Sequence, residues 1–270
     1  MRYFIQLSFD GAAYHGWQIQ PNGVSVQETL QKALSTLLRQ PIEVVGAGRT
    51  DAGVHARMMV AHFEVPLNPP VMGDLVYKLN KLLPQDIAVQ RAWPVADDMH
   101  ARFSATSRTY QYYIHTRKNP FLRDRSWLVT FPLDFDRMNE AASRLFQYED
   151  FTSFSKVNTD VKTNLCHIVE AKWENLPLTP SQGGGMTHNE NRGEEWVFTI
   201  TANRFLRNMV RAIVGTLVEV GRGRMTVDEF CQVIERKDRC SAGESVPAHA
   251  LFLTDIQYPL TNSSQPSTDS

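Results

Sequence analysis

The segment Gly48–Ala56, with the sequence G-R-T-D-A-G-V-H-A, holds the residue types best suited to chemistry. Asp51 lies between Gly48 and Gly53 and close to Arg49. Glycine permits positive φ and a close approach of a ligand to the backbone, and a nearby guanidinium keeps a carboxylate ionised. An ionised, partly desolvated aspartate can act as a covalent nucleophile. An aspartate that only caps a turn fits the same pattern, and composition alone favours that interpretation.

A second candidate is Tyr110, in the sequence R-T-Y-Q-Y. The alternation of side chains along a strand places Arg108, Tyr110 and Tyr112 on one face. From the residues alone, this pattern predicts an aromatic ladder between strands.

Basic side chains recur along a helix that we expect over residues 204–220. Apolar residues form one stripe of it, and Arg204, Arg207 and Arg211 recur at i, i+3 and i+7 on another. Surface arginines usually form a solvated face, but a row that begins near a helix N-terminus also suits phosphate binding.

The histidines and cysteines have no spacing typical of a metal site, and the cysteines contain no C-x-x-C pair. We therefore expect ordinary hydrogen-bonded histidines, reduced cysteines, no metal and no disulfide framework. The residues concerned are His55, His62, His100, Cys166, Cys231 and Cys240.

The elements that must position these side chains follow from hydrophobic periodicity. Residues 2–9 alternate as a half-buried strand, and a capping-box pattern at Ser25 and Glu28 begins an amphipathic helix. The later segments predict the order β-α-β-β-α-β, which is typical of a ferredoxin-like fold. They are strands 42–47 and 58–65, helix 74–82 and strand 86–93.

The second half repeats this order, with an extra helix that begins at Thr226 and has Glu229 as its capping partner. We predict an α+β fold of two ferredoxin-like halves, whose antiparallel sheets form a central sheet with helices on one face. The expected domains are 1–105, 106–260 and a disordered tail, 261–270; Pro177–Gly193 is expected to be a surface loop. The expected elements are strand 109–116, helix 134–146, strands 165–173 and 196–201, helix 204–220 and strand 251–258.

Composition limits the classes of function. The 270 residues are 42% hydrophobic and 21% charged, and they contain no apolar run long enough for a membrane helix. The first residues lack a signal-peptide core, so we expect a cytoplasmic protein. The net charge is −1, which means that any nucleic-acid site must be a local basic patch.

The Gly48–Ala56 segment resembles the signature loop of TruA-type tRNA pseudouridine synthases. Other parts of the chain resemble motifs of the same family, over residues 3–258 in total. One position departs from the pattern, because Ala250 stands where a glycine is expected. The motifs are D-G-x-x-Y-x-G-W-Q from Asp10, L-N-x-x-L-P-x-D-I from Leu79, H-A-R-F from His100, D-F-T-S-F from Asp150 and M-V-R-x-x-V-G from Met209.

The resemblance implies an isomerase that converts uridine to pseudouridine at positions 38–40 of the tRNA anticodon stem-loop. It implies that the nucleophile is Asp51, by either a ribosyl-enzyme or a glycal route, with no cofactor, and that the protein is a homodimer with a basic cleft across the subunits. The implied substrate contacts are Tyr110 stacked on the uracil, Arg211 paired with Asp51, Arg207 on the RNA, Arg49 on Asp51 or the flipped nucleotide, and Leu251 beneath the uracil.

Two other classes of function fit parts of the sequence. The D-A-G of residues 51–53 slightly resembles the D-[ST]-G of aspartic proteases, but it lacks the hydroxyl residue and a second such loop. A non-catalytic RNA-binding module would use the same sheet, aromatic and basic residues. That class leaves the Arg-Asp loop without a purpose.

Overall fold

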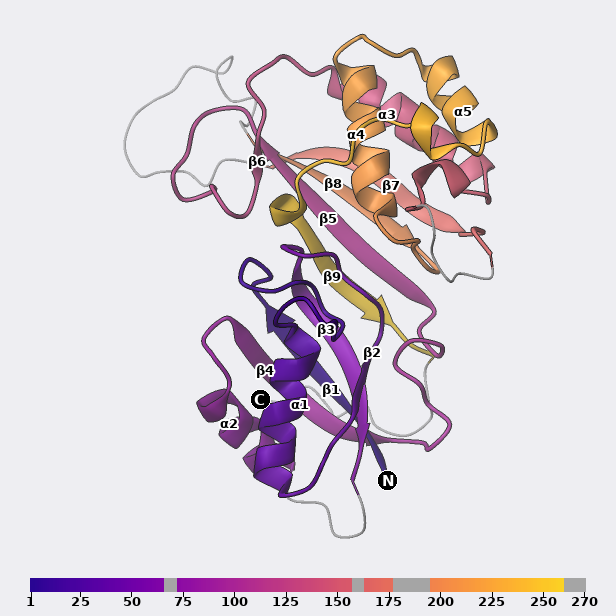
Figure 1. Cartoon of the computed structure of the whole chain (residues 1–270). Coiled ribbons are helices and arrows are strands. Elements are labelled where there is room, and N and C mark those ends of the chain that lie inside the picture. The colour runs from indigo at the N-terminus through magenta and orange to yellow at the C-terminus, as the bar shows by residue number, and fades with distance from the viewer. Residues whose placement is uncertain (66–71, 157–162, 177–194, 260–270) are drawn as a thin grey trace, which may run out of the picture.

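The fold is α+β, and one mixed β-sheet runs through both halves of the chain (Figure 1). The computed structural model describes residues 1–65, 72–156, 163–176 and 195–259. Within these ranges the main strand order is β4-β1-β3-β9-β5-β8-β7, with β2 paired to β3 and β6 paired to β5. The expected surface loop at 177–193 and the expected tail at 261–270 lie outside the described residues.

The first half has the predicted order β-α-β-β-α-β, and its strands pair antiparallel in the order β4-β1-β3-β2. The side chain of Ser25 accepts a hydrogen bond from the backbone N–H of Glu28, so this predicted cap of α1 is present. The elements are β1 (Arg2–Phe9), α1 (Val26–Leu38), β2 (Val44–Gly46), β3 (His55–Glu64), α2 (Met72–Leu82) and β4 (Ile87–Val95).

The second half repeats the pattern, with antiparallel strands in the order β9-β5-β8-β7. The capping box of Thr226 and Glu229 is complete in both directions and begins α5, as predicted. The elements are β5 (Ser107–His115), β6 (Trp127–Leu128), α3 (Phe135–Arg144), β7 (Ile168–Leu176), β8 (Glu195–Ala202), α4 (Met209–Gly221), α5 (Val227–Glu235) and β9 (Leu251–Gln257). Short 3-10 helices cover Leu145–Gln147, Thr152–Phe154, Arg239–Ser241 and Ala248–Ala250.

The two halves meet where β9 lies between β3 and β5 (Figure 1). On one side β9 pairs antiparallel with β5, and on the other it pairs parallel with β3 through His55–Phe252 and Ala56–Leu253. The sheet is therefore mostly antiparallel. Its parallel contact lies at the first two residues of β3, His55 and Ala56, directly after the loop that holds Asp51.

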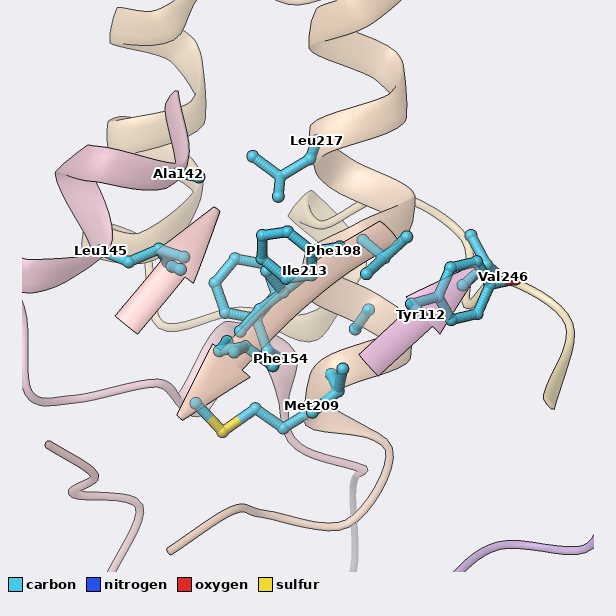
Figure 2. Close-up of a cluster of buried hydrophobic side chains, with 14 of the residues drawn as sticks. Tyr112, Ala142, Leu145, Phe154, Phe198, Met209, Ile213, Leu217 and Val246 are labelled. Carbon is cyan, nitrogen blue, oxygen red and sulfur yellow. The ribbon is translucent and has the colours of Figure 1, made fainter. Parts of the chain in front are cut away.

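Each half buries its own hydrophobic cluster. In the second half α4 is buried along most of its length and packs on β5 and β8 through Ile213, Tyr112 and Phe198 (Figure 2). Burial of each such large side chain stabilises the fold by about 1.5–3 kcal/mol. Tyr110 packs against both clusters, so the boundary between them passes through a predicted site residue.

The prediction of one helix over 204–220 is wrong at its start, because α4 begins only at Met209. Asn208 has a left-handed φ of 67°, which a right-handed helix cannot continue through. The carbonyl of Arg207 accepts a hydrogen bond from the Lys156 N–H at 3.1 Å, which holds this segment as a loop. The predicted row on one helix face is therefore also wrong, since its first two arginines lie in that loop and only the last lies on α4. The three are Arg204, Arg207 and Arg211.

Several other bounds differ from the predicted ones by a few residues. The clearest case is β7, which begins at Ile168 and not at 165. Leu165 forms an isolated bridge with Asp150, and the Cys166 N–H donates to the Glu149 carbonyl at 2.8 Å. These backbone groups have partners outside the sheet, so they do not extend the strand.

The close packing of α4 leads to a stability prediction for Gly215→Ala. Alanine in a helix is normally more stable than glycine by about 1 kcal/mol. Here the added Cβ would lie 1.8 Å from the Glu244 carbonyl oxygen, so the backbone must shift. We expect Gly215→Ala to lower the free energy of unfolding by about 1–3 kcal/mol, as measured by urea denaturation.

The matched control is Gly73→Ala on α2, where the added Cβ meets no atom within 4 Å. It should leave the free energy of unfolding unchanged or raise it by up to about 1 kcal/mol. Equal stability of the two variants would show that α4 can move away from Glu244 at no measurable expense.

Candidate active site

Asp51 lies in the loop that leads into β3, with a side chain that is 22% exposed. Its Oδ2 lies 3.3 Å from Nη1 of Arg211, and its Oδ1 lies 3.8 Å from Nε of Arg207. Arg211 is fixed in turn, because its Nε donates to the Val246 carbonyl at 2.7 Å. The first half of the chain thus supplies a carboxylate, and the second half supplies a guanidinium for each of its oxygens.

The D-G-x-x-Y-x-G-W-Q motif, which begins at Asp10, forms backbone hydrogen bonds with the loop that holds Asp51. Trp17 donates its backbone N–H to Oγ1 of Thr50 at 3.0 Å, and Gly53 donates its N–H to the Tyr14 carbonyl at 3.3 Å. Gly16 has a φ of +88°, and a Cβ there would lie 2.2 Å from the Thr50 carbonyl oxygen. Only glycine satisfies both constraints without strain, so this motif acts as a structural support of the loop.

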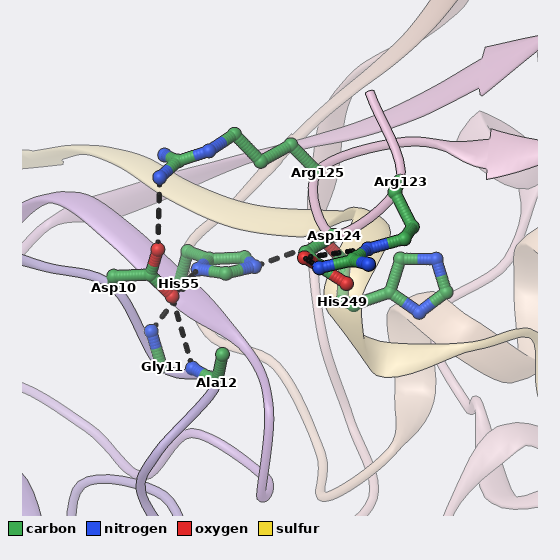
Figure 3. A network of polar contacts seen from close by, with 8 residues as sticks. All are labelled: Asp10, Gly11, Ala12, His55, Arg123, Asp124, Arg125 and His249. Atoms are coloured by element: carbon green, nitrogen blue, oxygen red, sulfur yellow. Dashed lines mark hydrogen bonds and ion pairs between the residues drawn. The ribbon is translucent and has the colours of Figure 1, made fainter. Parts of the chain in front are cut away.

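A polar network at the start of β3 ties this support to the second half of the chain (Figure 3). Gly11 donates its N–H to Nδ1 of His55 at 3.0 Å, and Nε2 of His55 donates to the His249 carbonyl at 3.0 Å. Burial lowers the pKa of His55, while the Asp10 carboxylate, whose Oδ1 lies 3.0 Å from Nδ1, acts in the opposite direction. Arg125 pairs with Asp10 at 2.9 Å, so the segment before β6 joins the same network.

A cavity of about 710 Å³ opens beside Asp51 at the boundary between the two halves. Its lining contains six arginines, while Asp51 is the one acidic residue among the described residues that line it. Aromatic and aliphatic side chains form the rest of the wall. The arginines are Arg49, Arg102, Arg108, Arg204, Arg207 and Arg211, and the large apolar residues include Phe103, Tyr110, Phe205, Leu206, Leu251, Leu253 and Ile256.

Tyr110 lies in the wall of this cavity and is partly buried. Its ring packs edge-on against Phe205, with 5.1 Å between the ring centroids and 86° between the planes. Burial raises the pKa of Tyr110 to about 12; the charge of Arg108 lowers it, and that of Asp51 raises it. The phenol is therefore protonated at neutral pH, and it can accept a proton only after it has lost its own.

Arg108 holds together three segments around the cavity. Its guanidinium donates to the carbonyls of Ala47 at 3.2 Å, Ala105 at 2.9 Å and Asn203 at 2.7 Å, and also to that of Arg102. Burial lowers the pKa of Arg108 below its usual value. The bonds reach the loop before Asp51, the connection between the halves and the loop before α4, so this one side chain positions three parts of the wall.

All six predicted site residues line this cavity: Asp51, Tyr110, Arg49, Arg207, Arg211 and Leu251. Arg49 is exposed, and within the described part of the chain it forms no ion pair with Asp51. Leu251 is buried and pairs in register with Tyr112. Sequence reasoning missed Arg108, Arg102, Phe103 and Phe205 as wall residues. The signal for Arg108 was present, since it alternates with Tyr110 on the same strand.

The described residues form neither a metal-binding cluster nor a membrane-spanning helix. Across residues 1–65, 72–156, 163–176 and 195–259, there is no cluster of three or more His, Cys, Asp or Glu side chains that could hold a metal ion. Over the same ranges no helix is both long and apolar enough to cross a membrane.

Comparison with known proteins gives a consistent result. A family model described as tRNA pseudouridine synthase matches residues 6–104 and 141–259. The tRNA pseudouridine synthase A of Bacteroides thetaiotaomicron is 59% identical over 260 residues, which cover 96% of this chain and 91% of that protein. The proteins of the same name from Bacteroides fragilis and Bacillus subtilis are 57% and 39% identical; the alignments cover 96% of this chain in both cases and 96% and 99% of those proteins. The cavity with its single aspartate thus lies in a chain that belongs to the tRNA pseudouridine synthase family.

Proposed function

We propose that this chain isomerises uridine to pseudouridine at positions 38–40 of the tRNA anticodon stem-loop, with Asp51 as the nucleophile. The observation that carries the proposal is the cavity itself, where one carboxylate faces six arginines in a chain of net charge −1. Such a concentration of guanidinium groups suits an RNA backbone, and a carboxylate among them suits reaction at a sugar carbon.

The reaction needs no net oxidation or reduction. A carboxylate oxygen of Asp51 attacks C1′ of the ribose, and the electrons of the broken N1–C1′ bond pass to the uracil. The uracil rotates, its C5 forms a bond to C1′, and the bond from C1′ to Asp51 breaks. The C5 proton is then lost to solvent and N1 takes up a proton, so the product has the same composition as the substrate. A glycal route, in which Asp51 removes a ribose proton, uses the same carboxylate position.

The cavity gives each remaining group a role. Arg211 is the less exposed of the two arginines beside Asp51 and is held by the Val246 carbonyl, so it orients the carboxylate. Arg207 has a side chain that is 47% exposed and contacts an RNA phosphate. Tyr110 stacks on the uracil. Leu251 forms the apolar contact beneath it.

The finer description of the fold is also a proposal. We infer two ferredoxin-like domains, 1–105 and 106–260, on the basis of the strand orders β4-β1-β3-β2 and β9-β5-β8-β7 and of the two separate hydrophobic clusters.

We also propose a homodimer that binds tRNA in a cleft across both subunits, and a cytoplasmic location where that substrate occurs. No cofactor enters the proposed chemistry.

A non-catalytic RNA-binding protein remains the alternative function. It would account for the arginines and the aromatic wall of the cavity. It does not account for a carboxylate placed among cations that would otherwise attract phosphate, since that charge weakens RNA binding.

We expect Asp51→Asn to abolish the reaction and to preserve RNA binding. The change removes the nucleophile, keeps the side-chain size and deletes one negative charge from the cavity. We expect tritium release from tRNA labelled at uridine C5 to fall by about a thousandfold or more, while the Kd for tRNA changes by less than about threefold.

Asp74→Asn, an exposed carboxylate on α2, serves as the control and should keep full activity. If Asp51→Asn retained activity within about tenfold of the parent, another group would have to be the nucleophile.

The second prediction concerns Arg207→Ala. Loss of one phosphate contact should weaken tRNA binding at every sequence and reduce the slope of log Kd against log salt by about one unit. Arg137→Ala, which removes a more exposed arginine on α3, should leave the slope unchanged. An unchanged slope for Arg207→Ala would place that side chain in solvent and not on the RNA.

The third prediction concerns the extent of the substrate. With a net charge of −1, binding depends on shape and on phosphates spread over the tRNA and not on bulk charge. An intact tRNA should therefore react far faster than an isolated anticodon stem-loop at equal concentration and moderate salt. Equal initial rates would show that local contacts suffice, and modification in the T-loop would contradict the proposed target.

A further inference from the structure

Phe103 is an apolar side chain that is mostly exposed to solvent. It is 76% exposed, although it lines the cavity that holds Asp51. Among the large hydrophobic residues that the structure describes, only Phe121 is more exposed, at 89%, and Phe121 does not line this cavity. An exposed aromatic ring in the lining of a cavity that also contains cations is free to stack on a ligand.

The backbone under Phe103 is held in place. Nδ1 of His100 accepts the N–H groups of Arg102 at 3.1 Å and Phe103 at 3.3 Å. The N–H of Ser104 donates to the His100 carbonyl at 2.9 Å, and the N–H of His100 donates to Oγ of Ser104 at 2.9 Å. The guanidinium of Arg108 donates a hydrogen bond to the carbonyl of Arg102. Phe103 is thus presented by a closed turn that is ordered before any ligand arrives.

The surroundings of the ring show which chemistry it suits. One side lies against His100, with 4.4 Å between the ring centroids and 39° between the planes. The guanidinium carbon of Arg102 lies 5.6 Å from the centre of the Phe103 ring, and Arg49 and Arg204 line the same cavity. A flat apolar ring beside one guanidinium, in a cavity that further arginines line, matches a nucleobase with its attached phosphates.

We propose that Phe103 stacks on the base next to the target uridine and thereby replaces the stacking that is lost when that uridine leaves the helix. The inference rests on the proposed function. A base-paired nucleotide must be unstacked before Asp51 can reach its sugar, and this step is least unfavourable when the base is already unpaired. A preordered ring that fills the vacated space offsets the unfavourable step and requires no movement of the protein.

The test compares two tRNA substrates that differ only in the partner of the target uridine. In one the uridine pairs with adenine, and in the other it faces a pyrimidine. We expect Phe103→Ala to lower kcat/KM on the paired substrate by about tenfold or more, within the range for loss of one base–aromatic stack. On the mismatched substrate the loss should be at least about threefold smaller, because less unstacking is required.

Two variants complete the test. Phe103→Tyr keeps the flat ring and should stay within about threefold of the parent on both substrates. Phe121→Ala removes a more exposed ring that does not line the cavity and should match the parent.

Equal losses for Phe103→Ala on the two substrates would overturn the proposal, because they would place the ring on the flipped uracil or in general binding. No loss on either substrate would overturn it as well. Inactivity of the parent protein on both substrates would instead contradict the proposed function, so the two failures are distinguishable.

Discussion

The short parallel contact between β3 and β9 is the constraint on which the site depends. Two residue pairs, His55–Phe252 and Ala56–Leu253, join strands that lie nearly two hundred positions apart in the sequence. Because β9 is paired with β5 on its other edge, this contact continues the sheet from one half into the other. It also brings the loop of Asp51 beside the N-terminal end of α4, where Arg211 lies. The carboxylate and its cations therefore meet only when the halves are in register.

The distribution of charge follows from the same arrangement. The arginines of the cavity come from both halves and from the connection between them, so no single stretch of sequence is strongly basic. Arg108 differs from the others because its guanidinium is bound by backbone carbonyls. Those carbonyls satisfy its N–H groups and leave its charge without a carboxylate partner among the described residues. A chain of net charge −1 thereby gains a local positive potential.

Sequence reasoning found the elements whose signal is local. The period of β1, the caps of α1 and α5 and the order of strands and helices all follow from neighbouring residues, and the structure confirms them. The start of α4 could not be found in this way, because residues 204–208 fit a helical spacing and only the bond from Lys156 and the left-handed Asn208 exclude it. Arg108 differs, because its alternation with Tyr110 already places it on the same strand face, and only its bonds to carbonyls of distant segments are not encoded in a side-chain pattern.

The position of β9 also has a consequence for synthesis on the ribosome. Among the described residues, β9 (251–257) is the last strand to emerge, yet it lies in the middle of the sheet with neighbours on both sides. Until they arrive, one edge of β3 and one edge of β5 have unpaired N–H and C=O groups along the stretches that β9 later covers. Exposed strand edges of this kind promote association between nascent chains. The step that completes the cavity beside Asp51 is thus the same step that covers these two strand edges.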